Sequence, residues 1–241
     1  MCIAILKPKG KTISKDILKT CHESNPDGGG FMYCHDNVLH LKKGFMRFDD
    51  FYNSFKKVNS FNHDMLIHFR IKTHGAISKT NCHPFLVSQD IGFIHNGIID
   101  IKTSGVESDT MAFNRHILKN IFDLRSAIES QGIQELISDY IGNSKLVFLD
   151  NRSNHTIINE HLGIWDNGSW FSNSSFDSCD TKINAPYEYE IYDAWSPINC
   201  YSCDNELITD EELINEICGD CAKTDKYYKK WFLNDSPYKG R

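Results

Sequence analysis

The chain has 241 residues, of which 40% are hydrophobic, and a formal net charge of −6 at neutral pH. This length allows one substantial core with a small appended module, and the negative balance excludes a general attraction to nucleic acid or to anionic membranes. The sequence contains no run of eighteen apolar residues and no secretory signal, so we expect a cytoplasmic protein without a membrane-spanning helix.

Short apolar segments in the first 175 or so residues predict buried strands. They cover residues 2–6, 66–70, 92–95 and 145–149. The segment SNPDGGG at 24–30 predicts a loop, because three glycines and a Pro-Asp step are costly inside a regular element.

Two segments predict helices. The first begins at Asp49 or Asp50 and runs through Val58. The second is capped by Ser108, has Asp109 in its first turn, and is expected to be helical as far as a broad apolar face reaches. That face comprises Met111, Phe113, Ile117, Leu118, Ile121 and Phe122.

The pattern changes after Phe176, where Pro186, Pro197 and the loss of any sustained period predict a linker. We therefore expect a first domain over residues 1–177, a linker over 178–199 and a separate module over 200–241.

A cysteine follows the initiator methionine. Removal of Met1 would leave a thiol and a free α-amine on Cys2, with reference pKa values of about 8.5 and about 8, so the amine can act as the general base for the thiol. Taken alone, a cysteine in CIAIL is more often a small buried hydrophobic residue, and other segments must decide between these readings.

Four further segments carry polar groups suited to an amino-acid amide. Arg70 in HFRIKTHG can grip a carboxylate, or form a surface ion pair. Asn96 and Gly97 in IHNG can donate two hydrogen bonds to an oxyanion, although such a pair is commonly a turn. Asp109 in SDT can bind an ammonium group, or serve only as a helix-start charge. NCHPF at 81–85 can be a structural corner.

These blocks occur in one order, MC, H-x-R-x-x-T-x-G, N-x-H-P-F, H-N-G and S-D-T, and they resemble the class II glutamine amidotransferases, a group of N-terminal nucleophile hydrolases. NPDGGGF at 25–31 and NGSWFSNSSF at 167–176 fit looser motifs, so the resemblance covers residues 1 to about 176. It implies an α+β fold of four αββα layers, in which two antiparallel sheets pack face to face between helices.

The resemblance also implies a glutaminase that hydrolyses L-glutamine to glutamate and ammonia. Cys2 would attack the side-chain amide, Asn96 and Gly97 would form the oxyanion hole, Arg70 would bind the α-carboxylate and Asp109 the α-ammonium. The roughly 40 residues after residue 200 are too few for an ammonia-using domain. We expect either a separate ammonia-accepting enzyme or protein partner, or a domain that acts alone.

Two alternatives remain open. One is an N-terminal-cysteine amidase that acts on other amides, against which Arg70 and Asp109 together speak. The other is a catalytically silent glutamine-binding or regulatory protein that never exposes the amine of Cys2 and acts through its C-terminal module.

Two C-x-x-C pairs near the end predict a zinc-ribbon-like module that holds one structural Zn²⁺ ion. The four ligands would be Cys200, Cys203, Cys218 and Cys221. A redox pair is the weaker alternative, because a thioredoxin-like context is missing, and iron is another possible metal. The tail KTDKYYKKWFLNDSPYKGR mixes basic and aromatic residues, which suits nucleic acid; nearby acidic residues favour a protein partner.

Overall fold

The computed structural model describes residues 2–58, 62–73, 76–103, 107–177, 198–199, 206–207, 212 and 218–224. The chain divides into two compact units, Met1–Trp195 and Ser196–Arg241. In the second unit, the described elements are the antiparallel strands β11 (Ile198–Asn199) and β12 (Glu206–Leu207) and helix α7 (Gly219–Thr224). No helix among the described residues has the length and apolar character needed to cross a membrane.

The first unit contains two antiparallel sheets. The larger has the order β3-β2-β4-β1-β10-β9, with bounds β1 Ile3–Lys7, β2 Gly29–His35, β3 Val38–Phe45, β4 Met65–Phe69, β9 Ile164–Asp166 and β10 Ser169–Phe171. The smaller has the order β5-β6-β7-β8, with bounds β5 Phe85–Ser88, β6 Ile91–Asn96, β7 Lys145–Asp150 and β8 His155–Ile158.

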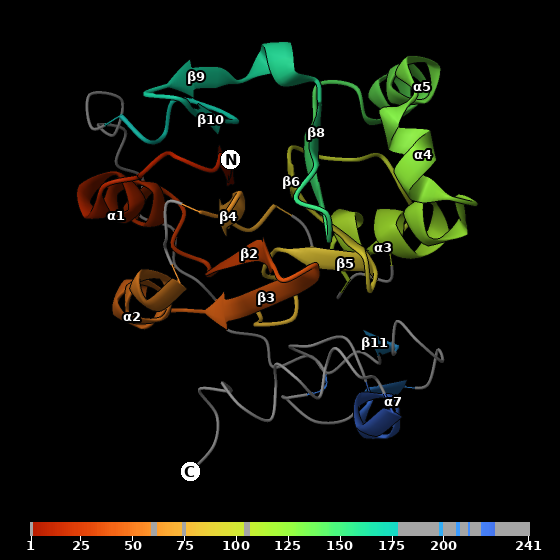
Figure 1. Cartoon of the computed structure of the whole chain (residues 1–241), viewed down its shortest axis with the longest axis horizontal. Coiled ribbons are helices and arrows are strands. Elements are labelled where there is room, and N and C mark those ends of the chain that lie inside the picture. The colour runs from red at the N-terminus through yellow and green to blue at the C-terminus, as the bar shows by residue number, and fades with distance from the viewer. Residues whose placement is uncertain are drawn as a thin grey trace. The chain divides into compact units, whose positions relative to one another are not determined.

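Helices cover one face of each sheet (Figure 1). Helices α1 (Lys15–Ser24) and α2 (Phe48–Val58) pack on the larger sheet, and α3 (Asp109–His116), η1 (Leu118–Asn120), α4 (Leu124–Glu129) and α5 (Gln131–Ile141) pack on the smaller. A third cluster fills the space between the two sheets, with Leu66 from β4, Ile94 from β6 and Val147 from β7. The first unit therefore has the four αββα layers that were expected.

Strand β1 shows why the apolar segments form this core. Ile3 and Ile5 pack with the helix-side cluster, whereas Ala4 and Leu6 pack in the cluster between the sheets. Because side chains alternate between the faces of a strand, a strand covered on both faces is a continuous apolar run. The predicted strands correspond to β1, β4, β6 and β7, and the helix predicted from Asp49 or Asp50 corresponds to α2.

The loop predicted at 24–30 was too long, because Gly29 and Gly30 begin β2. A Cβ atom at Gly30 would contact the carbonyl oxygen of His83 and would lie 2.8 Å from the Cα atom of Lys43. Glycine is thus required here by the close approach of neighbouring backbone, a use of glycine that is compatible with a strand.

The helix that follows Ser108 is shorter than predicted. It ends at His116, a 3-10 turn follows, and Phe122 is 98% exposed instead of lying on the buried face. The side-chain amide of Asn120 donates to the carbonyl oxygens of Arg115 and His116 at 3.0 and 3.2 Å. These bonds satisfy carbonyls that the next helical turn would otherwise use, so the helix stops.

Candidate active site around Cys2

Cys2 immediately precedes β1, and the pairing of Ile3 with Phe69 brings it to the end of β4. Its thiol donates to the carbonyl oxygen of Ile71 at 3.3 Å, and the N–H of Ile71 lies 3.4 Å from the sulfur and donates to it. The sulfur is therefore held against the backbone of the residue that follows Arg70.

Two side-chain amides donate to the carbonyl oxygen of Cys2. One belongs to Asn96, the fully buried last residue of β6, and the other to Asn173, at 2.7 Å. The amide predicted for the oxyanion hole thus binds the backbone of the predicted nucleophile in this structure. Asn173 was not predicted as a site residue; its one sequence signal was its place in NGSWFSNSSF.

Burial raises the pKa of the Cys2 thiol above its ordinary value. The hydrogen bond from Ile71 and the positive charges of Arg70 and of the chain's N-terminus lower the pKa by smaller amounts. The thiol is therefore protonated at neutral pH, and it could act as a nucleophile only if a base took its proton.

Gly97 lies directly after β6 in a conformation that favours glycine, with φ +138°. A Cβ atom there would lie 2.7 Å from the Cα atom of Ser144. The hydroxyl of Ser144 donates to the carbonyl oxygen of Ile98 at 2.9 Å. This turn is consequently fixed against the residue that precedes β7.

Arg70 is only 3% exposed, so it is not a surface ion pair. Its Nη1 donates to the carbonyl oxygen of Ala76 at 3.0 Å. Its backbone N–H donates to the carbonyl oxygen of Gly28 at 2.8 Å, and its own carbonyl oxygen accepts from the N–H of Asp27 at 2.8 Å. The residue is thus held by backbone from both neighbouring loops.

Asp109 is the first residue of α3 and is 6% exposed. Its two carboxylate oxygens accept from the N–H groups of Ile99 at 2.8 Å and of Thr110 at 2.9 Å. An ionised carboxylate has about four acceptor sites, so the group retains capacity for a cationic ligand. The bond to Ile99 ties α3 to the segment that carries Asn96 and Gly97.

Three buried histidines contact one another, and one of them contacts Thr110, the residue after Asp109. The rings of His68 and His83 have centroids 3.9 Å apart, His68 Nε2 donates to the carbonyl oxygen of His95 at 2.9 Å, and His95 Nδ1 is 2.8 Å from the hydroxyl of Thr110. Burial lowers the pKa of His68 to about 3, of His95 to about 4, and of His83 well below its ordinary value. All three imidazoles are neutral near pH 7.

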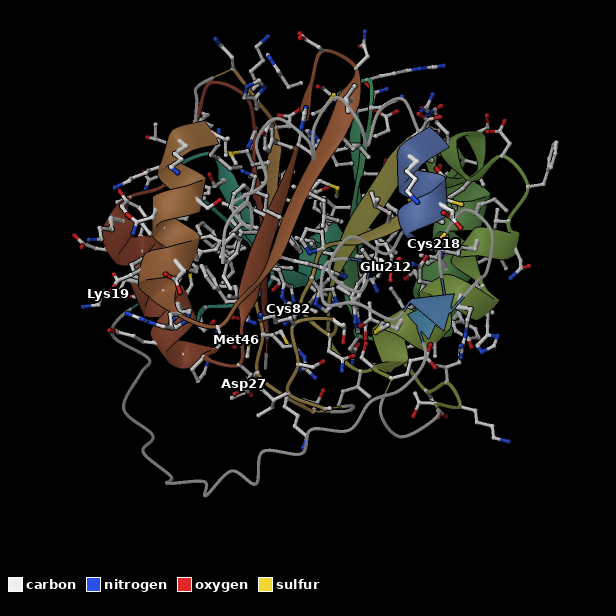
Figure 2. All side chains as sticks on the ribbon, turned by 90° about the horizontal axis from the view of Figure 1, so that it is seen from below. Lys19, Asp27, Met46, Cys82, Glu212 and Cys218 are labelled. Atoms are coloured by element: carbon white, nitrogen blue, oxygen red, sulfur yellow. The ribbon has the colours of Figure 1, made fainter. Side chains whose placement is uncertain are left out.

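Only part of the predicted zinc site belongs to the described residues. Cys200 and Cys203 lie outside them, whereas Cys218 is buried and Cys221 is partly buried in α7. The carboxylate of Glu212 accepts from the N–H of Gly219 at 2.6 Å, beside Cys218 (Figure 2). Within the described residues, no group of three or more His, Cys, Asp or Glu side chains is arranged to hold a metal.

No protein-family model matches the chain, and no curated protein matches it. Among solved structures, it is similar to glutamine phosphoribosylpyrophosphate amidotransferase from B. subtilis in complex with ADP and GMP, at 14% identity and a TM-score of 0.44. The match covers 71% of this chain and 41% of that chain, so this chain spans less than half of that protein. A similarity this distant does not assign a function, and the assignment depends on the residues around Cys2 and their contacts.

Proposed function

We propose that the first unit is a class II glutamine amidotransferase-type glutaminase with the N-terminal nucleophile hydrolase fold, and that it hydrolyses L-glutamine to glutamate and ammonia. The observation that carries the proposal is the convergence of three separate segments on Cys2, to one of which a fourth is tied. The sulfur contacts Ile71, next to Arg70, and the carbonyl oxygen accepts from Asn96 and Asn173. Asp109 is bonded to the backbone two residues after Gly97, in the segment that carries Asn96.

The first half of the reaction begins after removal of Met1, when the α-amine of Cys2 accepts the thiol proton. The sulfur then forms a bond to the side-chain amide carbon of glutamine, and the carbonyl electrons move to the oxygen. Donors at Asn96 and Gly97 stabilise this oxyanion. The C–N bond breaks, the nitrogen takes the proton from the ammonium group of Cys2, and ammonia leaves a glutamyl thioester.

In the second half, water loses a proton to the same amine and attacks the thioester carbon. The C–S bond breaks, the sulfur regains a proton, and glutamate departs. In the resting structure, the amide of Asn96 donates to Cys2 instead. Asn173 donates to the same carbonyl oxygen at 2.7 Å and can hold it while Asn96 serves the substrate.

In this proposal, two side chains of opposite charge bind the amino-acid end of the substrate. Arg70 binds the α-carboxylate, for which a planar guanidinium is suited, and Asp109 binds the α-ammonium. An enzyme for simple amides needs neither buried charge, and burying a charge without a use is costly.

The fate of the ammonia and the role of the C-terminal module belong to the same proposal. A separate ammonia-accepting protein partner is the expected acceptor, and a structural Zn²⁺ ion is proposed for Cys200, Cys203, Cys218 and Cys221. Thiolate sulfur in a set of four suits tetrahedral zinc.

The proposal is tested by intact mass before and after incubation with 6-diazo-5-oxo-norleucine, an electrophilic glutamine analogue. We expect loss of Met1, a single adduct that maps to Cys2, and glutamine hydrolysis that disappears in Cys2→Ala. Cys34→Ala is the matched control, because Cys34 is a buried free cysteine whose thiol donates to the carbonyl oxygen of Asn151. Retained Met1 without an adduct would support a silent binding protein, and turnover of other amides that survives Asp109→Ala would support the amidase.

A further inference from the structure

Asn81 joins the loop that holds Arg70 to the start of α3. It is 2% exposed. Its side-chain Nδ2 donates to the carbonyl oxygen of Ala76 at 3.0 Å and to the hydroxyl of Ser78 at 3.2 Å. Its Oδ1 accepts from the N–H of Ser108 at 3.1 Å, across 27 residues of sequence.

Each end of this side chain bonds to a backbone group that contacts or adjoins one of the two charged residues. The carbonyl oxygen of Ala76 also accepts from Nη1 of Arg70 at 3.0 Å, so Asn81 and the guanidinium share one acceptor. At the other end, Ser108 directly precedes Asp109 and caps α3, with its hydroxyl accepting from the N–H of Met111 at 3.2 Å.

We propose that Asn81 is a positioning residue that fixes the spacing between Arg70 and Asp109, and thereby makes the site specific for ligands that carry both an α-carboxylate and an α-ammonium. This inference rests on the proposed function. A ligand with both charges gains from both partners only when their separation matches its own, whereas a ligand with one charge needs one partner alone.

The role requires both polar ends of an asparagine. Nδ2 must donate toward Ala76 and Oδ1 must accept from Ser108, and an aspartate of the same shape keeps only the acceptor. Asn114, near the other end of α3, offers a matched comparison, because it is also buried and its side-chain amide donates to the carbonyl oxygen of Leu86 at 2.9 Å and not to that of Ala76.

The experiment measures binding without catalysis, by calorimetry on the full chain with Cys2→Ala. Three ligands are compared: L-glutamine, glutaramate, which lacks the ammonium, and 4-aminobutanamide, which lacks the carboxylate. With Asn81→Asp added, we expect L-glutamine affinity to fall about tenfold, the loss of one well-placed hydrogen bond. The two truncated ligands should change less than threefold, and Asn114→Asp should leave all three affinities unchanged.

Two results would overturn the inference. One is unaltered L-glutamine affinity in a folded Asn81→Asp protein, and the other is an equal loss for all three ligands, which a merely structural role would produce. If Asn81→Asp does not fold, Asn81→Ser is measured in the same way with the same expectation. Failure of the Cys2→Ala protein itself to bind L-glutamine would overturn the proposed function and the inference together, a result distinct from the other two.

Discussion

At the residue scale, the position of Cys2 depends on groups that bond to its backbone as well as to its sulfur. The carbonyl oxygen accepts from Asn96 and Asn173, and Asn173 is itself held because its Oδ1 accepts from the N–H and hydroxyl of Ser175 at 3.0 and 2.7 Å. A side chain just beyond β10 therefore orients the residue that precedes β1.

Asn173→Ala removes one of the two donors to Cys2. We expect the rate of glutamine hydrolysis to fall about tenfold, because the sulfur loses a fixed approach to the substrate, while the free energy of unfolding falls by about 1 kcal/mol. Steady-state kinetics and urea unfolding check both values. Asn53→Ala, on the exposed side of α2, is the control; an unchanged rate for Asn173→Ala would contradict this role.

Gly97→Ala should be severe, because the new methyl group meets the Cα atom of Ser144 and the backbone conformation disfavours any side chain. We expect a loss of about 2 kcal/mol or more in the free energy of unfolding, together with loss of hydrolysis. Gly132→Ala is the opposite case, since a Cβ atom in that helical position has nothing within 4 Å. It should gain about 0.5–1 kcal/mol. Equal urea midpoints for the two variants would refute the argument.

At the element scale, helix α3 and strand β1 bring the site together. Strand β1 lies between β4 and β10, so Cys2 is next to residues from both. Helix α3 begins with Asp109, and its capping residue Ser108 accepts from Met111 and donates its N–H to Asn81. The start of this helix thus contributes residues to the candidate site and does not only support it.

Ser108→Ala and Ser14→Ala compare two helix caps of the same chemistry. Each serine hydroxyl accepts from a backbone N–H at 3.2 Å, of Met111 in α3 and of Ile17 in α1. Both variants should lose about 1 kcal/mol of stability. Only Ser108→Ala should also raise KM for glutamine, because only that cap positions Asp109. Parallel thermal unfolding and kinetics distinguish them, and a raised KM in Ser14→Ala would argue against the assignment.

Continuous apolar runs in the sequence predicted four of the ten strands described in the first unit, because a strand covered on both faces requires such a run. The layer architecture was expected from the resemblance of the motifs to a known family. The sequence-based predictions were wrong where tertiary contacts determine the bounds of an element. Gly30 lies in a strand because the backbones of residues 43 and 83 pass close to it, and the helix stops before Phe122 because of the side chain of Asn120. Asn173 could not be assigned to the site from sequence, since its partner Cys2 lies 171 positions away.

At the scale of the whole molecule, the two sheets enclose polar groups as well as an apolar core. His68, His83 and His95 are all buried, and each has a pKa lowered by burial. An unfolded histidine has a pKa near 6.5. Below that pH the unfolded chain binds protons that the folded chain does not, so the free energy of unfolding falls as the pH drops from about 6.5 toward about 4.

We therefore expect urea stability to fall between pH 6.5 and pH 4 more steeply than one proton allows, which is about 1.4 kcal/mol per pH unit. His83→Gln should reduce this slope by about one proton, because it removes one buried titrating group. His161→Gln is the control, since His161 is exposed. If the free energy of unfolding of the unmodified protein changed by less than the value for one proton per pH unit, or if both substitutions had an equal effect, these histidines would not be the cause of the pH dependence.

The place of β1 in the larger sheet also orders events during synthesis. Its neighbour β4 ends at Phe69, but β10 and Asn173 come about a hundred residues later. At a translation rate of roughly 5–20 residues per second, β10 and Asn173 are synthesised roughly 10–30 s after the first residues of the chain. During that interval the carbonyl oxygen of Cys2 cannot yet accept from Asn173, so in the proposed glutaminase we expect Met1 to be removed before this last contact forms.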